Sequence, residues 1–157
     1  MIWPLKEGKN KLTDGVAAEI EYFRGDASSG ITPPNLLKEC TFAEHIVRAR
    51  GKRDKFTSVS LSPSSIRCFG DTLWQLKCKD CITAGHTLVE HPQLLSNLQE
   101  IIKSEVKADR ARAIQALRYA KTRKEGLIDW QLGISSVDRK ELENWTALQV
   151  RPFFSRR

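Results

Sequence analysis

The stretch FTSVSLSPSSIRCFG, residues 56–70, decides what kind of fold this chain forms. Its first six residues alternate, so that Phe56, Ser58 and Ser60 share one face of a strand and the intervening residues share the other. Residues 63–69 then predict a short helix, which Gly70 ends. A short strand joined directly to a short helix indicates a sheet with helices inserted between its strands.

The same pattern extends to both sides of this stretch. We expect further strands over 19–24, 72–78, 86–90, 126–132 and 146–150. We expect helices over 35–39, 42–50, 94–106, 108–121 and 136–143, with Thr41 and Glu44 forming a capping box at the second of these. Short strands that alternate with helices favour an α+β fold around a small mixed or antiparallel sheet, and we expect one domain over residues 1–157.

Composition and charge narrow the possible classes of protein. The chain has 157 residues, is 40% hydrophobic and 29% charged, and carries a net charge of +7. These values exclude a disordered chain, a collagen and a simple coiled coil. No apolar run approaches the roughly 20 residues of a membrane span, and residues 1–12 lack the apolar core of a secretory signal. We therefore expect a cytoplasmic protein with no membrane contact, and its basic charge favours a polyanionic partner.

The cysteines raise the question of a metal site. Cys78 and Cys81 have the spacing of a zinc knuckle, and His86 and His91 follow them. The interval to His86 is too short for the helix that separates the ligand pairs of a zinc finger. We expect no metal, and interpret Cys78 and Cys81 as reduced thiols at a hairpin end, although zinc ligation stays open as the alternative.

Three groups of candidate site residues fall in a definite order along the predicted strands. YFRG at 22–25 ends the first strand, FTSVS at 56–60 follows a His45-containing helix and the basic turn 51–53, and Glu125 precedes the strand at 126. This order, over roughly residues 19–132, resembles the ADP-ribosyltransferase toxins of the Arg–Ser–Glu class. It also resembles the ADP-ribosyltransferase-type domains of bacterial polymorphic and toxin–antitoxin toxins.

The resemblance implies an ADP-ribosyltransferase-like fold and an enzyme that uses NAD as its substrate. Cleavage of the nicotinamide–ribose bond generates an oxocarbenium-like ribose, which the carboxylate of Glu125 would stabilise. Arg24 would hold the cofactor's phosphates, and Ser58 would orient Glu125 and the ribose. The remaining cofactor-binding candidates are Tyr22, Gly25, His45, Thr57, Ser60 and Phe69, with Phe69 stacking on nicotinamide.

Two features of the sequence predict which molecule accepts the ADP-ribose: a departure from the family pattern and a cluster of positive charge. Arginine-modifying members of the family carry a second acid two residues before the glutamate, but Arg123 stands there. A cationic cluster beside Glu125 favours a nucleic-acid acceptor, RNA over DNA; its members are Lys103, Lys107, Arg110, Arg112, Arg118, Lys121, Arg123 and Lys124. A toxin of this kind implies an antitoxin or immunity protein as a further partner.

Other interpretations stay open. A metal-independent ribonuclease toxin would use His45, His86, His91, Arg50 and Lys52. A non-enzymatic module would bind nucleic acid through the basic helix, and Glu90 rivals Glu125 as the key carboxylate. Each proposed site residue also fits a purely structural role at a strand end or on a solvated helix face. A Ser–His–Asp hydrolase is disfavoured because no Gly-x-Ser-x-Gly elbow occurs. The sequence has neither a P-loop nor a Gly-x-Gly-x-x-Gly motif, which disfavours a P-loop NTPase and a Rossmann cofactor domain.

Overall fold

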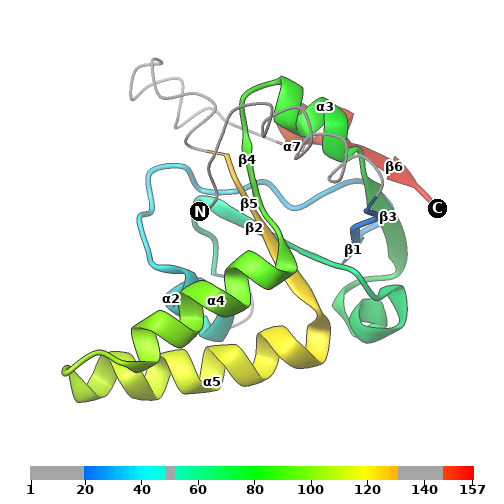
Figure 1. Cartoon of the computed structure of the whole chain (residues 1–157). Helices are drawn as coiled ribbons and strands as arrows, with labels where there is room; N and C mark the ends of the chain where they lie inside the picture. The colour runs from blue at the N-terminus through cyan, green and yellow to red at the C-terminus, as the bar shows by residue number, and fades with distance from the viewer. Residues whose placement is uncertain (1–19, 49–51, 131–146) are drawn as a thin grey trace, which may run out of the picture.

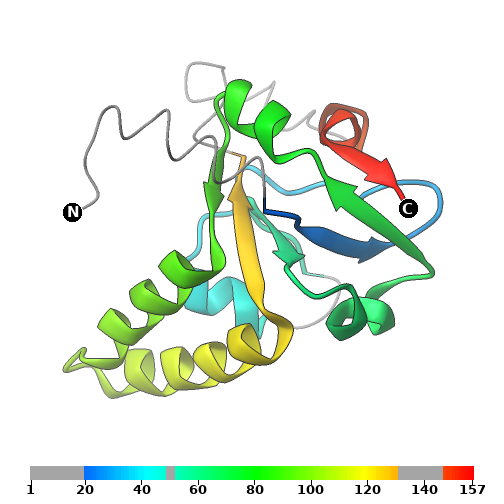
Figure 2. The same cartoon turned by 45° about the vertical axis from the view of Figure 1, so that its right-hand side comes forward.

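The computed structural model describes residues 20–48, 52–130 and 147–157 as an α+β fold (Figures 1 and 2). The strands are β1 (Phe23–Asp26), β2 (Phe56–Ser60), β3 (Thr72–Leu76), β4 (Thr87–Val89), β5 (Glu125–Asp129) and β6 (Phe154–Arg156). The α-helices are α2 (Phe42–Val47), α3 (Cys78–Thr83), α4 (His91–Ile102), α5 (Lys107–Arg123) and α7 (Ala147–Val150). Two 3₁₀ helices, η1 (Pro63–Phe69) and η3 (Arg151–Phe153), complete the described elements.

The six strands form one antiparallel sheet in the order β4-β5-β2-β1-β3-β6. β2 pairs with β5 along its whole length, and β1 pairs with β3 in the same way. The two central strands β1 and β2 are joined by a single residue pair, Phe23 opposite Ser60. The sheet therefore has two well-paired halves, and its weakest junction lies at the centre.

Each face of the sheet has its own apolar core. Phe56 and Leu127 pack against α2, α4 and α5 on one face, where α4 and α5 form the long helical hairpin of Figure 1. Val59 and Ile128 point to the opposite core, which includes Trp74 and the helix α3. This confirms the alternation predicted for residues 56–61 and places Ser58 on the same side of β2 as α2.

The connection between α5 and β5 is a single residue. Lys124 has φ 49° and ψ 51°, the left-handed conformation that ends helices, and its N–H donates to Ala120 O and Lys121 O. Glu125 follows at once as the first residue of β5. A non-glycine residue in this conformation costs roughly 1 kcal/mol, which the surrounding packing must offset.

Gly25 allows η1 to lie directly against β1. A Cβ at this position would stand 2.6 Å from the carbonyl oxygen of Ile66, which is closer than any real Cβ contact. The absence of a side chain at Gly25 therefore lets the Ile66–Phe69 end of η1 approach the strand, and this brings Phe69 to the edge of β1.

The structure corrects several predicted boundaries. Residues 35–39 form a turn and not a helix, because the Asn35 side chain accepts the Leu37 N–H, and this bond replaces helical pairing. The predicted strand at 146–150 is wrong: residues 147–150 are helical, and the edge strand is β6, where Phe154 pairs with Leu76 and enters the core. The first strand lies later than expected and contains Gly25 and Asp26. The predicted helix 136–143 lies outside the described residues.

The cysteine pair also differs from expectation. Cys78 and Cys81 lie one turn apart on the helix α3, not at a hairpin end, and both are buried. Across the described ranges, no helix has the length and apolar character needed to cross a membrane.

Candidate functional site

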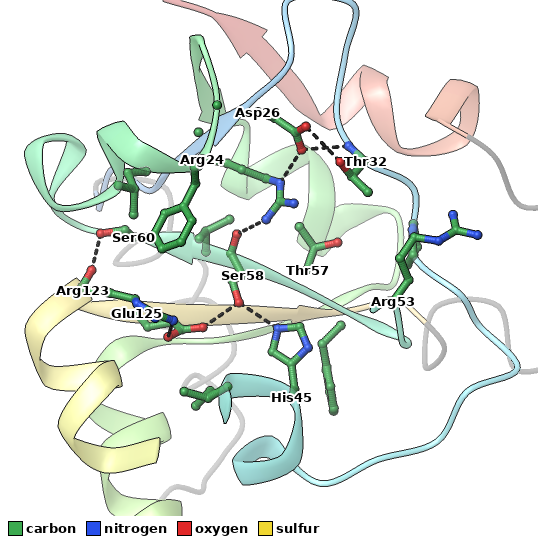
Figure 3. Close-up of a pocket in the computed structure, with 18 of the residues that line it drawn as sticks. Arg24, Asp26, Thr32, His45, Arg53, Thr57, Ser58, Ser60, Arg123 and Glu125 are labelled. Atoms are coloured by element: carbon green, nitrogen blue, oxygen red, sulfur yellow. Dashed lines mark hydrogen bonds and ion pairs between the residues drawn. The ribbon is translucent and has the colours of Figure 1, made fainter. Parts of the chain in front are cut away.

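A cavity of about 590 Å³ opens at the weak central junction of the sheet (Figure 3). Its volume lies in the range of small-molecule and cofactor sites. It is lined by β1, the 32–34 loop, α2, residues 52–54, β2, η1 and the α5–β5 connection. The cavity therefore draws its residues from segments that are far apart in the sequence.

Arg24 bridges the two strands that separate at this cavity. Its Nη1 donates to the carbonyl oxygen of Ser58 at 2.9 Å, and its Nε donates to Asp26 Oδ2 at 2.9 Å. The guanidinium thus takes the place of strand pairing between β1 and β2 beyond Phe23 and Ser60. A guanidinium has five N–H donors, so Arg24 retains donors for an anion in the cavity.

Asp26 is the counter-ion that fixes Arg24. Burial pushes the pKa of Asp26 up, but Arg24 and the hydrogen bonds from Thr32 and Ala27 outweigh it and hold that pKa below its ordinary value. The Thr32 N–H and hydroxyl donate at 2.8 and 2.9 Å, and the Ala27 N–H donates at 2.9 Å. Asp26 is therefore an ionised carboxylate with fixed geometry.

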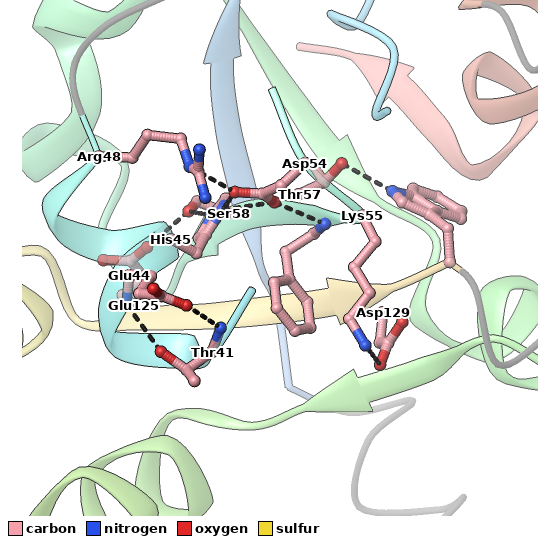
Figure 4. Close-up of polar contacts among 12 residues, drawn as sticks. Thr41, Glu44, His45, Arg48, Asp54, Lys55, Thr57, Ser58, Glu125 and Asp129 are labelled. Atoms are coloured by element: carbon pink, nitrogen blue, oxygen red, sulfur yellow. Dashed lines mark hydrogen bonds and ion pairs between the residues drawn. The ribbon is translucent and has the colours of Figure 1, made fainter. Parts of the chain in front are cut away.

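Four side chains form a continuous hydrogen-bonded chain along the cavity wall (Figure 4). His45 Nδ1 lies 2.8 Å from the carboxylate of Asp54, and His45 Nε2 lies 2.7 Å from Ser58 Oγ. Ser58 Oγ in turn lies 2.5 Å from Glu125 Oε2. The chain joins α2, the start of β2 and the start of β5 into one polar unit, named here the Asp54–Glu125 chain.

Local structure fixes both His45 and Asp54. α2, which carries His45, begins with the predicted capping box: Thr41 Oγ1 accepts the Glu44 N–H and Glu44 Oε1 accepts the Thr41 N–H. Asp54 is 1% exposed, accepts the Phe56 N–H at 2.9 Å and lies 3.0 Å from Arg48 Nε. Burial raises the pKa of Asp54, but its contacts with His45 and the Phe56 N–H outweigh burial and lower that pKa overall.

Glu125 combines deep burial with incomplete hydrogen bonding. It is 2% exposed, and burial raises its pKa against the opposing effects of Ser58, His45, Arg123 and Arg24. Its Oε1 is buried with no hydrogen-bond partner among the described residues; the nearest cation, Arg123 Nη1, is 3.9 Å away. Buried carboxylate oxygens normally have a hydrogen-bond partner. Because Oε1 has none among the described residues, it is available to accept a hydrogen bond from a ligand hydroxyl.

An aromatic and cationic rim lies beside Glu125. The guanidinium of Arg123 stands 5.1 Å from the ring of Phe69 and 4.9 Å from the ring of Tyr119. Phe69 is 40% exposed, which is unusual for a large apolar side chain. This arrangement offers a planar ligand both a ring face and a positive charge.

The structure gathers all but one of the predicted site residues. Glu125, Arg24, Ser58, Gly25, His45, Thr57, Ser60 and Phe69 line the cavity. Tyr22 does not: it is fully buried in the core, and its hydroxyl accepts the His91 N–H at 2.8 Å. Two lining residues have hydroxyls already engaged, since Thr57 accepts from the Trp130 indole at 2.7 Å and Ser60 donates to the Arg123 carbonyl.

Sequence reasoning missed Asp54, Asp26 and Thr32. Asp54 was hidden in the turn at 51–54, whose lysine and arginine suggested only a basic surface. Its one signal is an acid two residues before a strand that begins with Phe56. Glu90, the rival carboxylate, stands at the N-cap position of α4, where its side chain makes no capping hydrogen bond, and it is not among the residues lining the cavity.

The cysteines and the other histidines lie outside the cavity lining. Burial raises the pKa of Cys78 to about 11 and that of Cys81 to about 12, so both stay protonated thiols. His86 packs against Trp130, and His91 Nδ1 lies 2.8 Å from the Glu125 carbonyl oxygen. Within the described ranges, no three His, Cys, Asp or Glu side chains are placed to hold a metal ion. Of the three histidines predicted for a ribonuclease, only His45 lines the cavity, so the three are not gathered in one site.

Comparison of the chain with protein-family models, with curated proteins and with solved structures finds no match.

Proposed function

We propose that this protein is an ADP-ribosyltransferase that cleaves the nicotinamide–ribose bond of NAD and transfers ADP-ribose to RNA. The observation that carries the proposal is Glu125, whose buried Oε1 lacks a hydrogen-bond partner in the described part of the chain, while its Oε2 is held by Ser58. The separated central strands, with Arg24 and Ser58 on opposite sides of the gap, support an ADP-ribosyltransferase-like fold.

The chemistry needs a negative charge beside the ribose. As nicotinamide leaves, positive charge develops at the anomeric carbon, and a fixed carboxylate stabilises it most effectively where water is excluded. Glu125 Oε1 would accept a ribose hydroxyl, and Ser58 prevents the carboxylate from rotating. NAD acts here as the substrate, and the proposal requires no metal.

The opposite side of the cavity suits the cofactor's pyrophosphate. Arg24 is fixed by Asp26 and has donors to spare, and Lys52 and Arg53 line the same cavity while exposed to solvent. A planar guanidinium held at two points binds phosphate oxygens with little loss of entropy. Phe69 would stack on the nicotinamide ring.

Arg123 supports an acceptor other than arginine. It lies 3.9 Å from Glu125 Oε1, where arginine-modifying enzymes of this class have an acid. A guanidinium at this point repels an incoming arginine and attracts a phosphate-bearing acceptor. The ring of Tyr119 beside it suits a nucleobase. A transferase acting on RNA inside a cell implies an antitoxin or immunity protein that protects the producing cell.

The proposal is tested with NAD labelled in its adenylate group, the purified protein, and separate pools of RNA, DNA and cell protein. We expect release of nicotinamide together with transfer of the label to RNA. Release of nicotinamide with label on protein alone would retain the transferase and reject the RNA acceptor. RNA cleavage in the absence of NAD, with no nicotinamide released, would reject the transferase and favour the ribonuclease.

The exposed cations of α5 are expected to guide RNA to the cavity. Arg118 and Lys121 are exposed and form no ion pair with any described residue. Replacing both with glutamine should raise the KM for RNA several-fold and reduce the slope of log affinity against log salt by roughly 1.4. The KM for NAD should not change. A Lys77→Gln/Lys79→Gln variant has the same net charge and controls for position; equal effects in both pairs would contradict a role for α5.

A serine hydrolase is the second candidate, because Asp54, His45 and Ser58 have the order of a hydrolytic triad. The 2.5 Å bond of Ser58 to Glu125 weighs against it, since it occupies the hydroxyl that would attack. A fluorophosphonate probe distinguishes the two: labelling of Ser58 together with NAD-independent esterase activity would favour the hydrolase.

A further inference from the structure

The Asp54–Glu125 chain contains three contacts of hydrogen-bond length and can therefore hold up to three protons, one in each contact. Asp54 is ionised, so the first bond uses the proton on His45 Nδ1. Before the reaction the other two contacts hold only the Ser58 hydroxyl proton; a third proton, taken up during the reaction, resides on Glu125 or on His45 Nε2. Moving that proton between the two ends requires only that the Ser58 hydroxyl reverse its direction. Ser58 therefore connects Glu125 to a second proton-accepting group.

We propose that His45, acting through Ser58, is the final acceptor of the proton that an acceptor hydroxyl loses when it attacks the ribose. The proposal rests on the proposed function and assigns it a route for the proton. It also assigns the acceptor's chemical class, a hydroxyl of the RNA or water, because a terminal phosphate would attack as an anion and need no such route.

The step balances in atoms and charge. The C–N bond to nicotinamide breaks, and the bonding pair leaves with neutral nicotinamide, which leaves the ribose as an oxocarbenium ion. The acceptor oxygen forms the new C–O bond and loses its proton to Glu125 Oε2, the oxygen in contact with Ser58. Glu125 passes a proton to Ser58 as Ser58 passes its own to His45 Nε2, which leaves an imidazolium beside Asp54 and an ionised Glu125. No oxidant or reductant takes part.

The surroundings explain why a second proton acceptor is needed. Glu125 is buried, so a proton that stayed on it would remove the charge that the next turnover requires. Asp54 balances the imidazolium, and Arg48 and the Phe56 N–H hold Asp54 in turn. The charged groups that face these four side chains are Arg24 from β1, Arg48 at the end of α2 and Arg123 at the end of α5, besides Asp54 and Glu125 themselves. The one further titratable group among the described residues in contact with Asp54 is the thiol of Cys40, whose pKa burial raises to about 12.

The test is the pH dependence of nicotinamide release, measured with the RNA pool as acceptor. The wild type should lose activity as the pH falls, because a chain that already holds its third proton cannot take up the acceptor's proton. His45→Gln keeps hydrogen-bonding groups but cannot take up a proton. It should lower kcat about 100-fold at neutral pH, change the KM for NAD less than about threefold, and lose the acid limb that depends on His45. Ser58→Ala should have the same effect on the pH profile, since it breaks the route.

Controls separate this inference from folding and from the proposed function. His86→Gln removes a histidine outside the cavity lining and should keep the acid limb; thermal melts identify any variant that is not folded. A His45→Gln enzyme with wild-type kcat, or with an unchanged acid limb, would overturn the relay and leave the transferase intact. A rise in KM without a fall in kcat would show that His45 only supports binding. A wild type that releases no nicotinamide would overturn both proposals.

Discussion

Glu125→Gln is expected to abolish nicotinamide release almost completely, with a loss of about 10³-fold in kcat. The amide keeps the shape of the side chain and still accepts the Ser58 hydroxyl, but it brings no negative charge to the ribose. Removing one charge-stabilising group from an enclosed site costs about 3–4 kcal/mol in the transition state. The measurement is single-turnover release of nicotinamide by the wild type and the variant at saturating NAD.

The same variant should change how stability depends on pH. The folded-state pKa of Glu125 is raised by burial above the ordinary value of 4.5, so folding favours its protonated form. Its contribution to stability is therefore fully present below pH 4.5 and is lost as pH rises through the folded-state pKa. Wild type should lose stability relative to Glu125→Gln over that interval, while Asp26 and Asp54 contribute equally to both proteins. Denaturant titrations at a series of pH values provide the measurement.

Glu90→Gln is the matched control for the activity measurement. Glu90 is also a partly buried glutamate whose pKa burial raises, but it lies outside the cavity lining. The Glu90→Gln protein should retain activity. A Glu125→Gln protein that releases nicotinamide at the wild-type rate would reject Glu125 as the charge that stabilises the ribose.

Arg24→Lys is expected to raise the KM for NAD by about 10- to 100-fold. Arg24 must bind Asp26, the carbonyl of Ser58 and the proposed pyrophosphate at once, which requires the several fixed donors of a guanidinium. An ammonium group retains the charge but cannot span these partners. Each lost hydrogen bond to a charged group is worth about 1.5–3 kcal/mol, which converts to this range of affinity.

Isothermal titration of NAD into the Glu125→Gln and the Arg24→Lys/Glu125→Gln proteins would measure this effect without turnover. Arg156→Lys makes the same exchange on β6, outside the cavity lining, and serves as the control. Equal affinity of the two proteins for NAD would place the pyrophosphate elsewhere in the cavity.

Order along the sequence was a good guide to the site, because antiparallel pairing brings strand ends together. Ser58 and Glu125 lie 67 residues apart in the sequence, yet β2 and β5 pair directly and place them 2.5 Å apart. The capping box at Thr41 correctly predicted where α2 begins and thereby the position of His45. These features depend on local patterns that survive in a single sequence.

The remaining features depend on contacts that no local pattern contains. Asp54 lies in a turn, and only the fold shows that it faces α2 and not solvent. Tyr22 lies only two residues before Arg24 in the sequence, but its ring packs against Gly126, where an added Cβ would stand 2.8 Å from Tyr22 Cε1. The helix α3 was mistaken for a strand end because Cys78 and Cys81 fit either period over so short a segment.

The single-residue turn at Lys124 makes α5 and the reactive carboxylate one mechanical unit. No loop lies between the helix that carries the cationic surface and the first residue of β5, and a left-handed backbone leaves little room for rotation at the join. The distance between the cations of α5 and Glu125 is therefore set by the backbone itself. If the proposed function holds, RNA bound along α5 would be held at a fixed distance from the carboxylate.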